Sequence, residues 1–230
     1  MVRIETKAMI PCRKILIATR NPAKVREIKA ILSDIPVEIV SLDEVDPERK
    51  IPEPEEKGKT FAENARAKAA YYAQATGLWA LADDSGLVVD ALNGAPGVRS
   101  ARYAADECGK NENIDQANNA KLLRELTGIE DEKRTARFIC HLVLSDGHKT
   151  LIETSGVING RITHQPRGEN GFGYDPLFLV PELGRTTAEL PPEQKNAISH
   201  RGQAVRKFAA RLKDFLNIST TTPTESTNKE

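Results

Sequence analysis

The sequence predicts an α/β fold in which helices pack on a mixed β-sheet. In the first half of the chain, short apolar strands alternate with amphipathic helices, as they do where helices connect neighbouring strands. In the second half, two strand-like runs flank Asp146-Gly147, a dipeptide typical of tight hairpins, so these strands are expected to pair antiparallel. Of the 230 residues, 39% are hydrophobic and 29% charged, as in ordinary folded globular proteins.

The first strand and the first helix follow one another directly. "KILIAT" (14–19) is a short β-branched run typical of a buried strand. Asn21 and Pro22 then predict a helix start, with asparagine as the N-cap and proline at the first helical position. The apolar face of this helix consists of Val25, Ile28 and Leu32. "VEIVSL" (37–42) is a second strand, and the charged, proline-spaced stretch 43–59 is a loop.

The clearest helix begins after this loop. Thr60 and Glu63 have capping-box spacing, an alanine-rich body runs to Ala75, and Gly77 stands where a helix ends. "LWALAD" (78–83) predicts a strand that stops at a pair of aspartates. The remaining elements are, in order, a glycine–proline loop (92–100), a helix (111–127), the hairpin (136–160), a glycine-rich loop (168–173), a short strand (176–180) and a final helix from about Ser199 to Leu216.

The domain plan is simple, and the chain shows no internal repeat. We expect one domain over residues 14–216, an N-terminal extension at 1–13 and a disordered tail at 217–230, where the sequence is polar and threonine-rich. No apolar run is long enough to cross a bilayer, and the first residues lack the apolar core of a signal peptide. A cytoplasmic location is therefore expected.

Charge and cysteine content narrow the function classes. The 33 basic residues balance 33 acidic ones, so the net charge is zero and nothing draws the whole chain toward nucleic acid or a membrane. The three cysteines are odd in number and form no CxxC pair, which favours a reducing compartment and disfavours structural zinc. Any anion must therefore bind at a local cluster of cations.

The stretch "ATRNPAK" (18–24) predicts an anion site. A strand that leads directly into a helix start offers free backbone N–H groups, which bind phosphate well. Lys24 falls in the first helical turn, where its positive charge opposes the helix dipole unless an anion lies nearby. The alternative is an ordinary connection with a solvated lysine.

The paired aspartates of "LADDSGLVVD" (81–90) are unusual beside so much apolar sequence. Neighbouring side chains point to opposite faces of a strand, so Asp83 and Asp84 need not serve one site. At the carboxyl end of a strand, where ligands of open α/β sheets bind, one carboxylate can face a metal or a water while the other accepts hydrogen bonds. The alternative is that both cap a turn.

The stretch "EEKGKT" (55–60) ends like a Walker A loop, but Glu53 stands where that motif needs glycine. Its carboxylates, Glu55 and Glu56, are instead candidate ligands for magnesium, which prefers oxygen. A solvated charged loop is the competing interpretation.

Two later stretches could recognise a base. In "GENGFGYDP" (168–176), glycines allow close backbone approach, and Phe172 offers a face for stacking on a nucleobase. In "KNAISHRGQA" (195–204), Lys195, His200 and Arg201 gather near a helix start, which suits an anion or a carbonyl oxygen. A structural aromatic residue and a capping histidine are the alternatives.

Together these stretches resemble the inosine triphosphate pyrophosphatase family, hydrolases of non-standard purine nucleoside triphosphates. The resemblance runs from about Lys14 to Leu216 and depends on five motifs in family order. They are "ATRNPAK", "TFAENARAKA", "ADDSGL" with "GAPGVRSARY", "GFGYDP" and "AISHRGQA". It implies an elongated, two-lobed α/β fold with a central cleft, and usually a homodimer. It also implies Mg²⁺-dependent hydrolysis of ITP, dITP and XTP to the monophosphate and pyrophosphate.

The resemblance also implies roles for particular residues. Asp84 would be the catalytic carboxylate and a magnesium ligand, with Glu55 or Glu56 completing the metal site and Ser85 contacting substrate. The phosphates would be held by Thr19, Arg20, Asn21, Pro22, Ala23 and Lys24, with Lys68 as a further candidate. The base pocket would consist of Phe172, Gly173, Tyr174, Asp175, Lys195, His200 and Arg201. One departure is Arg20, where members of the family often have glycine.

Residue chemistry fits this assignment. Lysines, helix amides and Mg²⁺ can neutralise a triphosphate, and a carboxylate can orient or deprotonate the attacking water. N–H donors in the base pocket would donate hydrogen bonds to the oxygen of a 6-oxo purine. The 6-amino group of adenine is itself a donor and could not accept them. Guanine shares the 6-oxo group, so it must be rejected at the 2-position. The alternatives are a Maf-like pyrophosphatase for modified pyrimidine triphosphates, which "SHRGQA" disfavours, and a non-catalytic nucleotide-binding module, which the carboxylates disfavour.

Overall fold

A computed structural model of the chain describes residues 14–109 and 112–216, in which the strands form one seven-stranded sheet. The predicted extension (1–13) and tail (217–230) lie outside the described residues. The sheet order is β2-β1-β3-β4-β5-β6-β7; the first three strands are parallel and the remaining pairs are antiparallel. The strands are β1 (Lys14–Ile17), β2 (Glu38–Ser41), β3 (Trp79–Val89), β4 (Thr135–Ser145), β5 (Thr150–Ile162), β6 (Phe178–Val180) and β7 (Arg185–Thr186). The predicted mixed sheet is confirmed.

Six α-helices flank the sheet within the described residues. They are α1 (Pro22–Leu32), α2 (Leu42–Val45), α3 (Phe61–Thr76), α4 (Ile114–Glu125), α5 (Pro192–Ile198) and α6 (His200–Phe215). The predicted caps at Asn21 and Thr60 form, and Ser199 also caps its helix; each of the three side chains accepts a backbone N–H of the first turn. The sequence does not predict α2, which overlaps the predicted loop at 43–59. It also does not predict α5, which is only two turns long.

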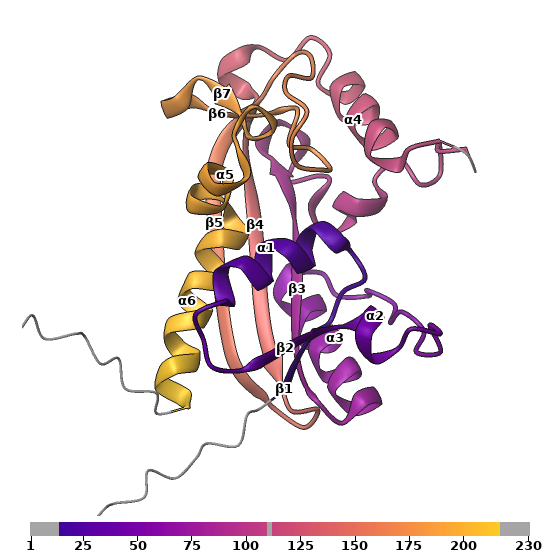
Figure 1. The fold of residues 1–230 in the computed structure, drawn as a ribbon. Helices are drawn as coiled ribbons and strands as arrows, with labels where there is room; N and C mark the ends of the chain where they lie inside the picture. Colours follow the sequence, from indigo (N-terminus) through magenta and orange to yellow (C-terminus); the bar gives the residue numbers. More distant parts are fainter. Residues whose placement is uncertain (1–13, 110–111, 217–230) are drawn as a thin grey trace, which may run out of the picture.

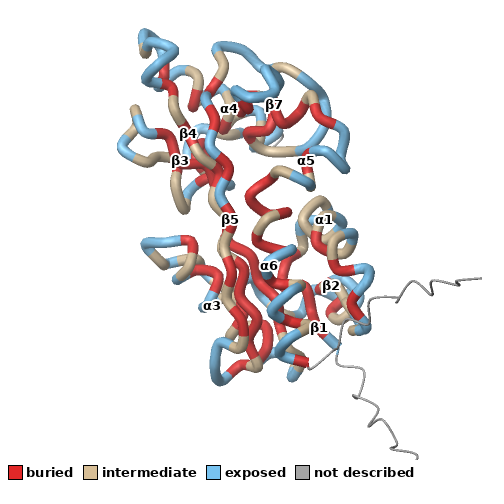
Figure 2. The backbone as a smooth tube through the Cα atoms, turned by 90° about the vertical axis from the view of Figure 1, so that its left-hand side faces the viewer, coloured by how far each residue is buried: buried red, intermediate tan, exposed pale blue. Residues whose placement is uncertain are grey.

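The molecule is elongated because the long strands β3, β4 and β5 run through both of its halves (Figure 1). In the lower half, α1 and α6 cover one face of the sheet, around Ile17, Ile28 and Phe208, and α3 covers the other. In the upper half, α4 and the segments around β6 enclose a separate core that includes Phe138 and Phe178. Buried residues follow the strands through both halves (Figure 2). The predicted two-lobed α/β fold is confirmed.

The prediction that a strand ends at Asp83 is wrong, because β3 continues through both aspartates to Val89. Its neighbour β1 is the strand that stops: Ile17 pairs with Leu81, and the chain then turns away into α1. On its other side, β3 stays paired with β4 along its length. The aspartates therefore lie just beyond the carboxyl end of β1, with one side of β3 open.

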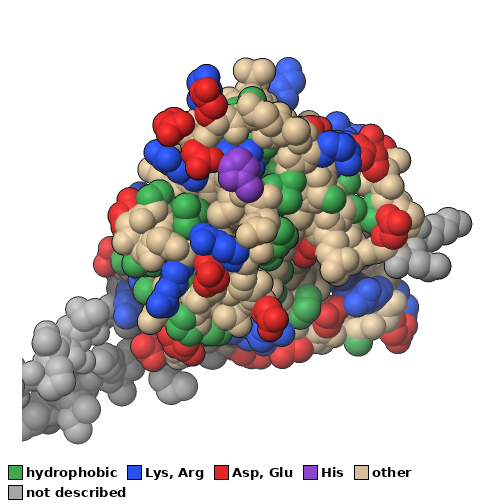
Figure 3. All heavy atoms as spheres, turned by 90° about the horizontal axis from the view of Figure 1, so that it is seen from above, with side chains coloured by type: hydrophobic (Ala, Val, Ile, Leu, Met, Phe, Trp, Pro, Cys, Tyr) green, Lys and Arg blue, Asp and Glu red, His purple; other side chains and the backbone are tan. Residues whose placement is uncertain are grey.

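The upper surface mixes acidic and basic side chains without a continuous stripe of one sign (Figure 3), as expected for zero net charge. Among the described residues, no helix combines the length and the apolar character that crossing a membrane requires.

Candidate active site

Two connected cavities lie on the open side of β3. The inner cavity, about 180 Å³, lies between β3, the loop 172–175 and the start of α6. The outer chamber, about 820 Å³, lies between β3, α3 and the loop 53–57. Asn21, Lys24 and Ser85 line both, so the two form one continuous cleft.

Asp83 anchors the cations of the inner cavity. Its side chain is completely buried, and its Oδ2 lies 3.1 Å from Lys24 Nζ and accepts hydrogen bonds from Arg201 Nε and Nη2. Burial favours the neutral carboxyl, but Lys24 and Arg201 outweigh it and hold the pKa of Asp83 well below its ordinary value. Asp83 therefore remains an anion, and this carboxylate of the protein balances the positive charge of Lys24 near the start of α1.

Asp84 points to the opposite face, toward α3 and the outer chamber. Its Oδ2 accepts a hydrogen bond of 3.0 Å from Asn64 Nδ2, and its Oδ1 accepts one from the amide of Ser85. Burial and repulsion from Glu56 raise the pKa of Asp84 to about 6. The two aspartates therefore have different chemistry: one is a permanent anion, and the other can exchange a proton near neutral pH.

Glu56, rather than Glu55, faces this carboxylate. Glu56 is 22% exposed and lies within 3.3 Å of Lys68 and 2.8 Å of Arg102. Burial opposes the charge of Glu56, but Lys68 and Arg102 lower its pKa. Glu55 also borders the chamber, yet its side chain is 75% exposed and pairs with Lys57. The structure thus favours Glu56 between the two predicted alternatives.

The expectation of free amides at the start of α1 is wrong, whereas phosphate binding by Thr19–Lys24 stays a prediction. The Asn21 side chain accepts both the Ala23 and Lys24 amides, while the Asn21 amide donates to Thr19 Oγ1. A good N-cap consumes the same donors that an anion needs. The Lys24 side chain, rather than the backbone, therefore borders the cleft, and it is paired there with Asp83.

Arg20 lies at the edge of the outer chamber but is directed to carboxylates of the protein. It donates 3.0 and 2.6 Å hydrogen bonds to Asp43 and Asp46. Burial opposes the charge of Arg20, but those two carboxylates raise its pKa above the ordinary value. Its guanidinium therefore secures the loop after α2.

The inner cavity has one aromatic wall and one cationic end. The Phe172 ring lies over Lys195 Nζ at 4.9 Å and Arg201 Cζ at 5.6 Å. His200 is buried and stacks on Phe138, with ring centroids 4.8 Å apart. Burial and the neighbouring cations lower the pKa of His200 well below its usual value, so its imidazole is neutral. Its Nδ1 is buried and has no hydrogen-bond partner among the described residues.

Most predicted residues meet in this cleft. All seven of the predicted base-pocket residues line the inner cavity: Phe172, Gly173, Tyr174, Asp175, Lys195, His200 and Arg201. The outer chamber is lined by Thr19, Arg20, Asn21, Lys24, Glu55, Glu56, Lys68, Asp84 and Ser85. Pro22 and Ala23 line neither cavity; Pro22 begins α1, and Ala23 faces a separate hollow between α1 and α5.

Sequence reasoning missed Glu27, which lies three residues after Lys24 on the same face of α1. It accepts hydrogen bonds from Lys195 Nζ at 3.1 Å and Arg201 Nη1 at 2.7 Å. It also missed Asn64, which holds Asp84, and Arg102, which holds Glu56. The helical spacing of Lys24 and Glu27 was a usable signal, whereas the other two contacts depend on the fold.

Replacing Glu27 with glutamine is expected to raise the KM for the ligand of the inner cavity about tenfold, because two buried cations lose a charged acceptor. The loss in the free energy of unfolding is expected to be smaller than the loss in binding, because Arg201 still pairs with Asp83 and Lys195 still pairs with Asp175. Steady-state kinetics measure the effect, and Glu38→Gln, in an exposed pair with Lys14, is the control. An unchanged KM would show that Glu27 does not orient these cations.

Asp84 and Glu56 are the carboxylates of the outer chamber that could bind a metal. No cluster of three or more His, Cys, Asp or Glu side chains able to hold a metal occurs in residues 14–109 and 112–216. Magnesium, however, is commonly bound by one or two carboxylates together with substrate phosphates. Asp84 and Glu56 repel one another across the chamber, which a dication would relieve. The residues present therefore fit a metal that arrives with its substrate.

The chain is an α/β protein with a mixed sheet. Where the parallel strands give way to antiparallel ones, a carboxylate pair and several cations line a cleft whose chemistry suits a polyanion. The neutral imidazole and aromatic wall beside the cations add a place for a planar ring. The chain belongs to the Ham1 family, whose sequence pattern matches residues 15–211.

Curated relatives and solved structures agree with this assignment. A protein named dITP/XTP pyrophosphatase from Geobacter sulfurreducens is 54% identical over 203 residues, covering 88% of this chain and 96% of that protein. One of the same name from Exiguobacterium sp. is 49% identical, covering 88% and 98%. A HAM1 protein structure from Coxiella burnetii has a TM-score of 0.77 at 43% identity, covering 88% and 99%. The resemblance predicted from the motifs is confirmed, and the family suggests a requirement for a divalent metal.

Proposed function

We propose that this chain hydrolyses non-standard purine nucleoside triphosphates (ITP, dITP and XTP) to the nucleoside monophosphate and pyrophosphate, with Mg²⁺ as the metal. The family and the names of its relatives support the assignment as a nucleoside triphosphate pyrophosphatase. The observation that carries the proposal is the continuity of the two cavities through Lys24 and Ser85. One molecule can place a base in the inner cavity and a triphosphate in the outer chamber.

Asp84 has the properties of a general base. Its carboxylate lines the outer chamber, where it can take a proton from water, and in the absence of metal, burial and Glu56 raise its pKa to about 6, so it is ionised at neutral pH. Water adds to phosphorus as its proton passes to Asp84, the α–β anhydride bond breaks, and pyrophosphate leaves with the bonding electron pair. Lys24 and Lys68 stabilise the charge that develops on the phosphate oxygens. Asp84 and Glu56 would hold the magnesium ion, which neutralises phosphate charge when bound.

Base selectivity depends on hydrogen-bond matching at the cationic end. Arg201 and Lys195, which line the inner cavity beside His200, are hydrogen-bond donors only. A 6-oxo group accepts from such donors, whereas the 6-amino group of adenine meets donor with donor and leaves buried groups unsatisfied. The protein is thus expected to hydrolyse ITP and XTP far faster than ATP.

A nucleotide panel tests the proposal directly. Pyrophosphate release from ITP, XTP, GTP, ATP and a pyrimidine triphosphate is measured with Mg²⁺ and after its removal by EDTA. We expect turnover of ITP and XTP that requires the metal, and a loss of about a hundredfold or more in Glu56→Gln but not in the matched variant Glu55→Gln. Faster turnover of ATP or of the pyrimidine nucleotide would overturn the substrate assignment and favour the Maf-like alternative. Binding of ITP without pyrophosphate release would favour a binding module.

The homodimer, the cytoplasmic location and the single domain over residues 14–216 stay predictions. The molar mass of the full chain in solution, measured by light scattering, tests the first of them.

A further inference from the structure

Side chains from the first two turns of α4 hydrogen-bond to one residue, Gly173, in a wall of the inner cavity. Asp115 Oδ2 accepts a 2.9 Å hydrogen bond from the Gly173 amide, and Asn119 Nδ2 donates a 3.0 Å bond to the Gly173 carbonyl. The two side chains are four residues apart and therefore lie on one face of the helix. Both polar groups of a single glycine are thus held from the same helix.

This glycine fixes the aromatic residue before it. Gly173 has a φ of +60°, a left-handed conformation that glycine adopts readily. The preceding amide, that of Phe172, donates a 2.8 Å bond to Asp175. With the loop held at both points, the Phe172 ring stays over Lys195 and Arg201. The position of the stacking face therefore depends on Asp115 and Asn119.

The same helix holds the opposite wall. Asn118 is 2% exposed; its Oδ1 accepts from the Ala104 amide, and its Nδ2 donates to the carbonyls of Ser100 and Ala101. Ser100 and Ala101 line the inner cavity, and Tyr174 donates a 2.9 Å bond to the Ser100 carbonyl across it. Three neighbouring polar residues of α4 thus set the separation of the two walls.

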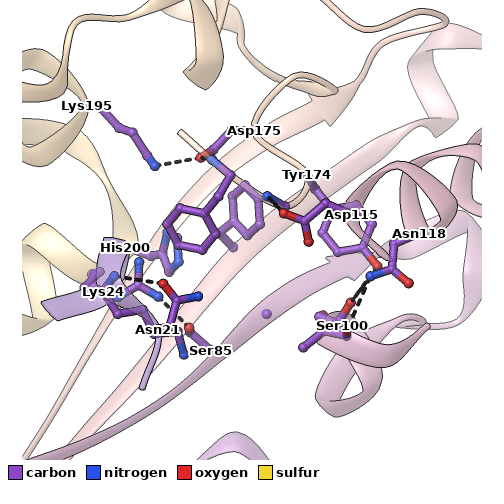
Figure 4. A pocket seen from close by; sticks show the side chains of 16 residues that line it. Asn21, Lys24, Ser85, Ser100, Asp115, Asn118, Tyr174, Asp175, Lys195 and His200 are labelled. Atoms are coloured by element: carbon purple, nitrogen blue, oxygen red, sulfur yellow. Dashed lines mark hydrogen bonds and ion pairs between the residues drawn. The ribbon is translucent and has the colours of Figure 1, made fainter. Parts of the chain in front are cut away.

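These contacts lie at the end of the cavity away from the cations. Figure 4 shows Asp115, Asn118 and Ser100 on one side of the cavity, with Lys24, Asn21 and His200 on the other. The 2- and 6-positions of a purine flank N1, and their exocyclic bonds diverge. A base whose 6-oxo group meets the cations therefore turns its 2-position, by which guanine differs from hypoxanthine, toward another wall of the cavity.

We propose that Asp115 and Asn119 are positioning residues that hold the Phe172–Gly173 wall against the base and thereby set the discrimination between hypoxanthine and guanine. Asn118 fixes the facing wall. The proposal deepens the proposed function and rests on it. Because the two residues act through Gly173, their loss affects binding of the base and leaves binding of the polyphosphate unchanged.

The test uses Asp115→Ala, Asn119→Ala and the conservative Asp115→Asn in the full chain. Each alanine variant removes one hydrogen bond to Gly173, so the KM for ITP is expected to rise about tenfold while kcat changes little. The preference for ITP over GTP, as a ratio of kcat/KM values, is expected to fall by a similar factor. Asp115→Asn is expected to keep most of the wild-type preference, because an amide oxygen still accepts from the Gly173 amide.

Two controls separate positioning from general damage. The inhibition constant of inorganic tripolyphosphate, which has no base, is expected to stay within twofold of wild type in every variant. Gln116→Ala, at an exposed position of the same helix, is expected to match wild type throughout. A wild-type KM and ITP:GTP ratio in both alanine variants would overturn the proposal, as would an equal loss of tripolyphosphate affinity. Failure of the wild type to hydrolyse ITP would instead overturn the proposed function.

Discussion

Asp84→Asn is expected to lower kcat for ITP about a thousandfold, because an amide cannot accept the proton of the attacking water. The same change is expected to stabilise the fold at neutral pH. Asp84 is only 6% exposed, and burial together with Glu56 raises its pKa to about 6. Ionising it in the folded protein therefore costs about 3 kcal/mol, and the amide loses one hydrogen bond worth about 1 kcal/mol. The net expectation is a gain of about 2 kcal/mol.

The pH dependence of stability tests this account. A group with a raised folded-state pKa stabilises the fold fully below its unfolded pKa, and this contribution disappears as pH rises through the folded pKa. The gain in Asp84→Asn should therefore be present at pH 7 and absent near pH 4, in denaturant unfolding without metal or nucleotide. Wild-type turnover by the variant would remove Asp84 from its catalytic role. Equal stability of the two proteins at pH 7 would show that the charge of Asp84 does not destabilise the fold.

Most of the fold could be predicted because its elements carry local signals. Asn21, Thr60 and Ser199 cap helices with their own side chains, and Asp146-Gly147 lies at a hairpin turn. The end of β3 could not be predicted in the same way. Gly86, which follows the aspartates, is a residue that often interrupts a strand, but a side chain there would meet Ser100 Oγ at 2.3 Å, so glycine serves close packing within a continuous strand. Local sequence does not distinguish a glycine that turns the chain from one that makes room for a neighbour.

The motifs of the site could be predicted from the sequence, but the ion pairs between their side chains could not. The motifs placed His200, Arg201 and Phe172 in one cavity correctly. Arg201, however, reaches Asp83 across 118 residues of sequence and Glu27 across 174. Such pairs have no local spacing, so the ion-pair network that orients the cations becomes visible only in the structure. The error over the amides near Lys24 is of another kind, because the Asn21 cap that accepts them is local and is itself predicted by the sequence.

Asp83→Asn is expected to have the opposite effect on stability from the change at its neighbour. Asp83 is the shared anion of Lys24 and Arg201, and both of those side chains are mostly buried. Removing one partner from a buried ion pair leaves uncompensated charge, so we expect a loss of about 3 kcal/mol in the free energy of unfolding at pH 7. The lost contribution belongs to a carboxyl with a depressed pKa, so it is present above the unfolded pKa of about 4 and disappears as pH falls below that value. Wild type and variant should therefore converge in strong acid.

Asp90→Asn is the matched control, because Asp90 also pairs with an arginine but its side chain is 50% exposed. Exposed pairs contribute at most about 1 kcal/mol, so this variant should unfold almost as wild type does. If Asp83→Asn cost no more than this control, Asp83 could not be the anchor of the cationic end. A loss confined to Asp83 would instead explain why the chain places two adjacent carboxylates in a buried strand. One of them pairs with the cations of the cleft, and the other, on the opposite face, would be free to take a proton.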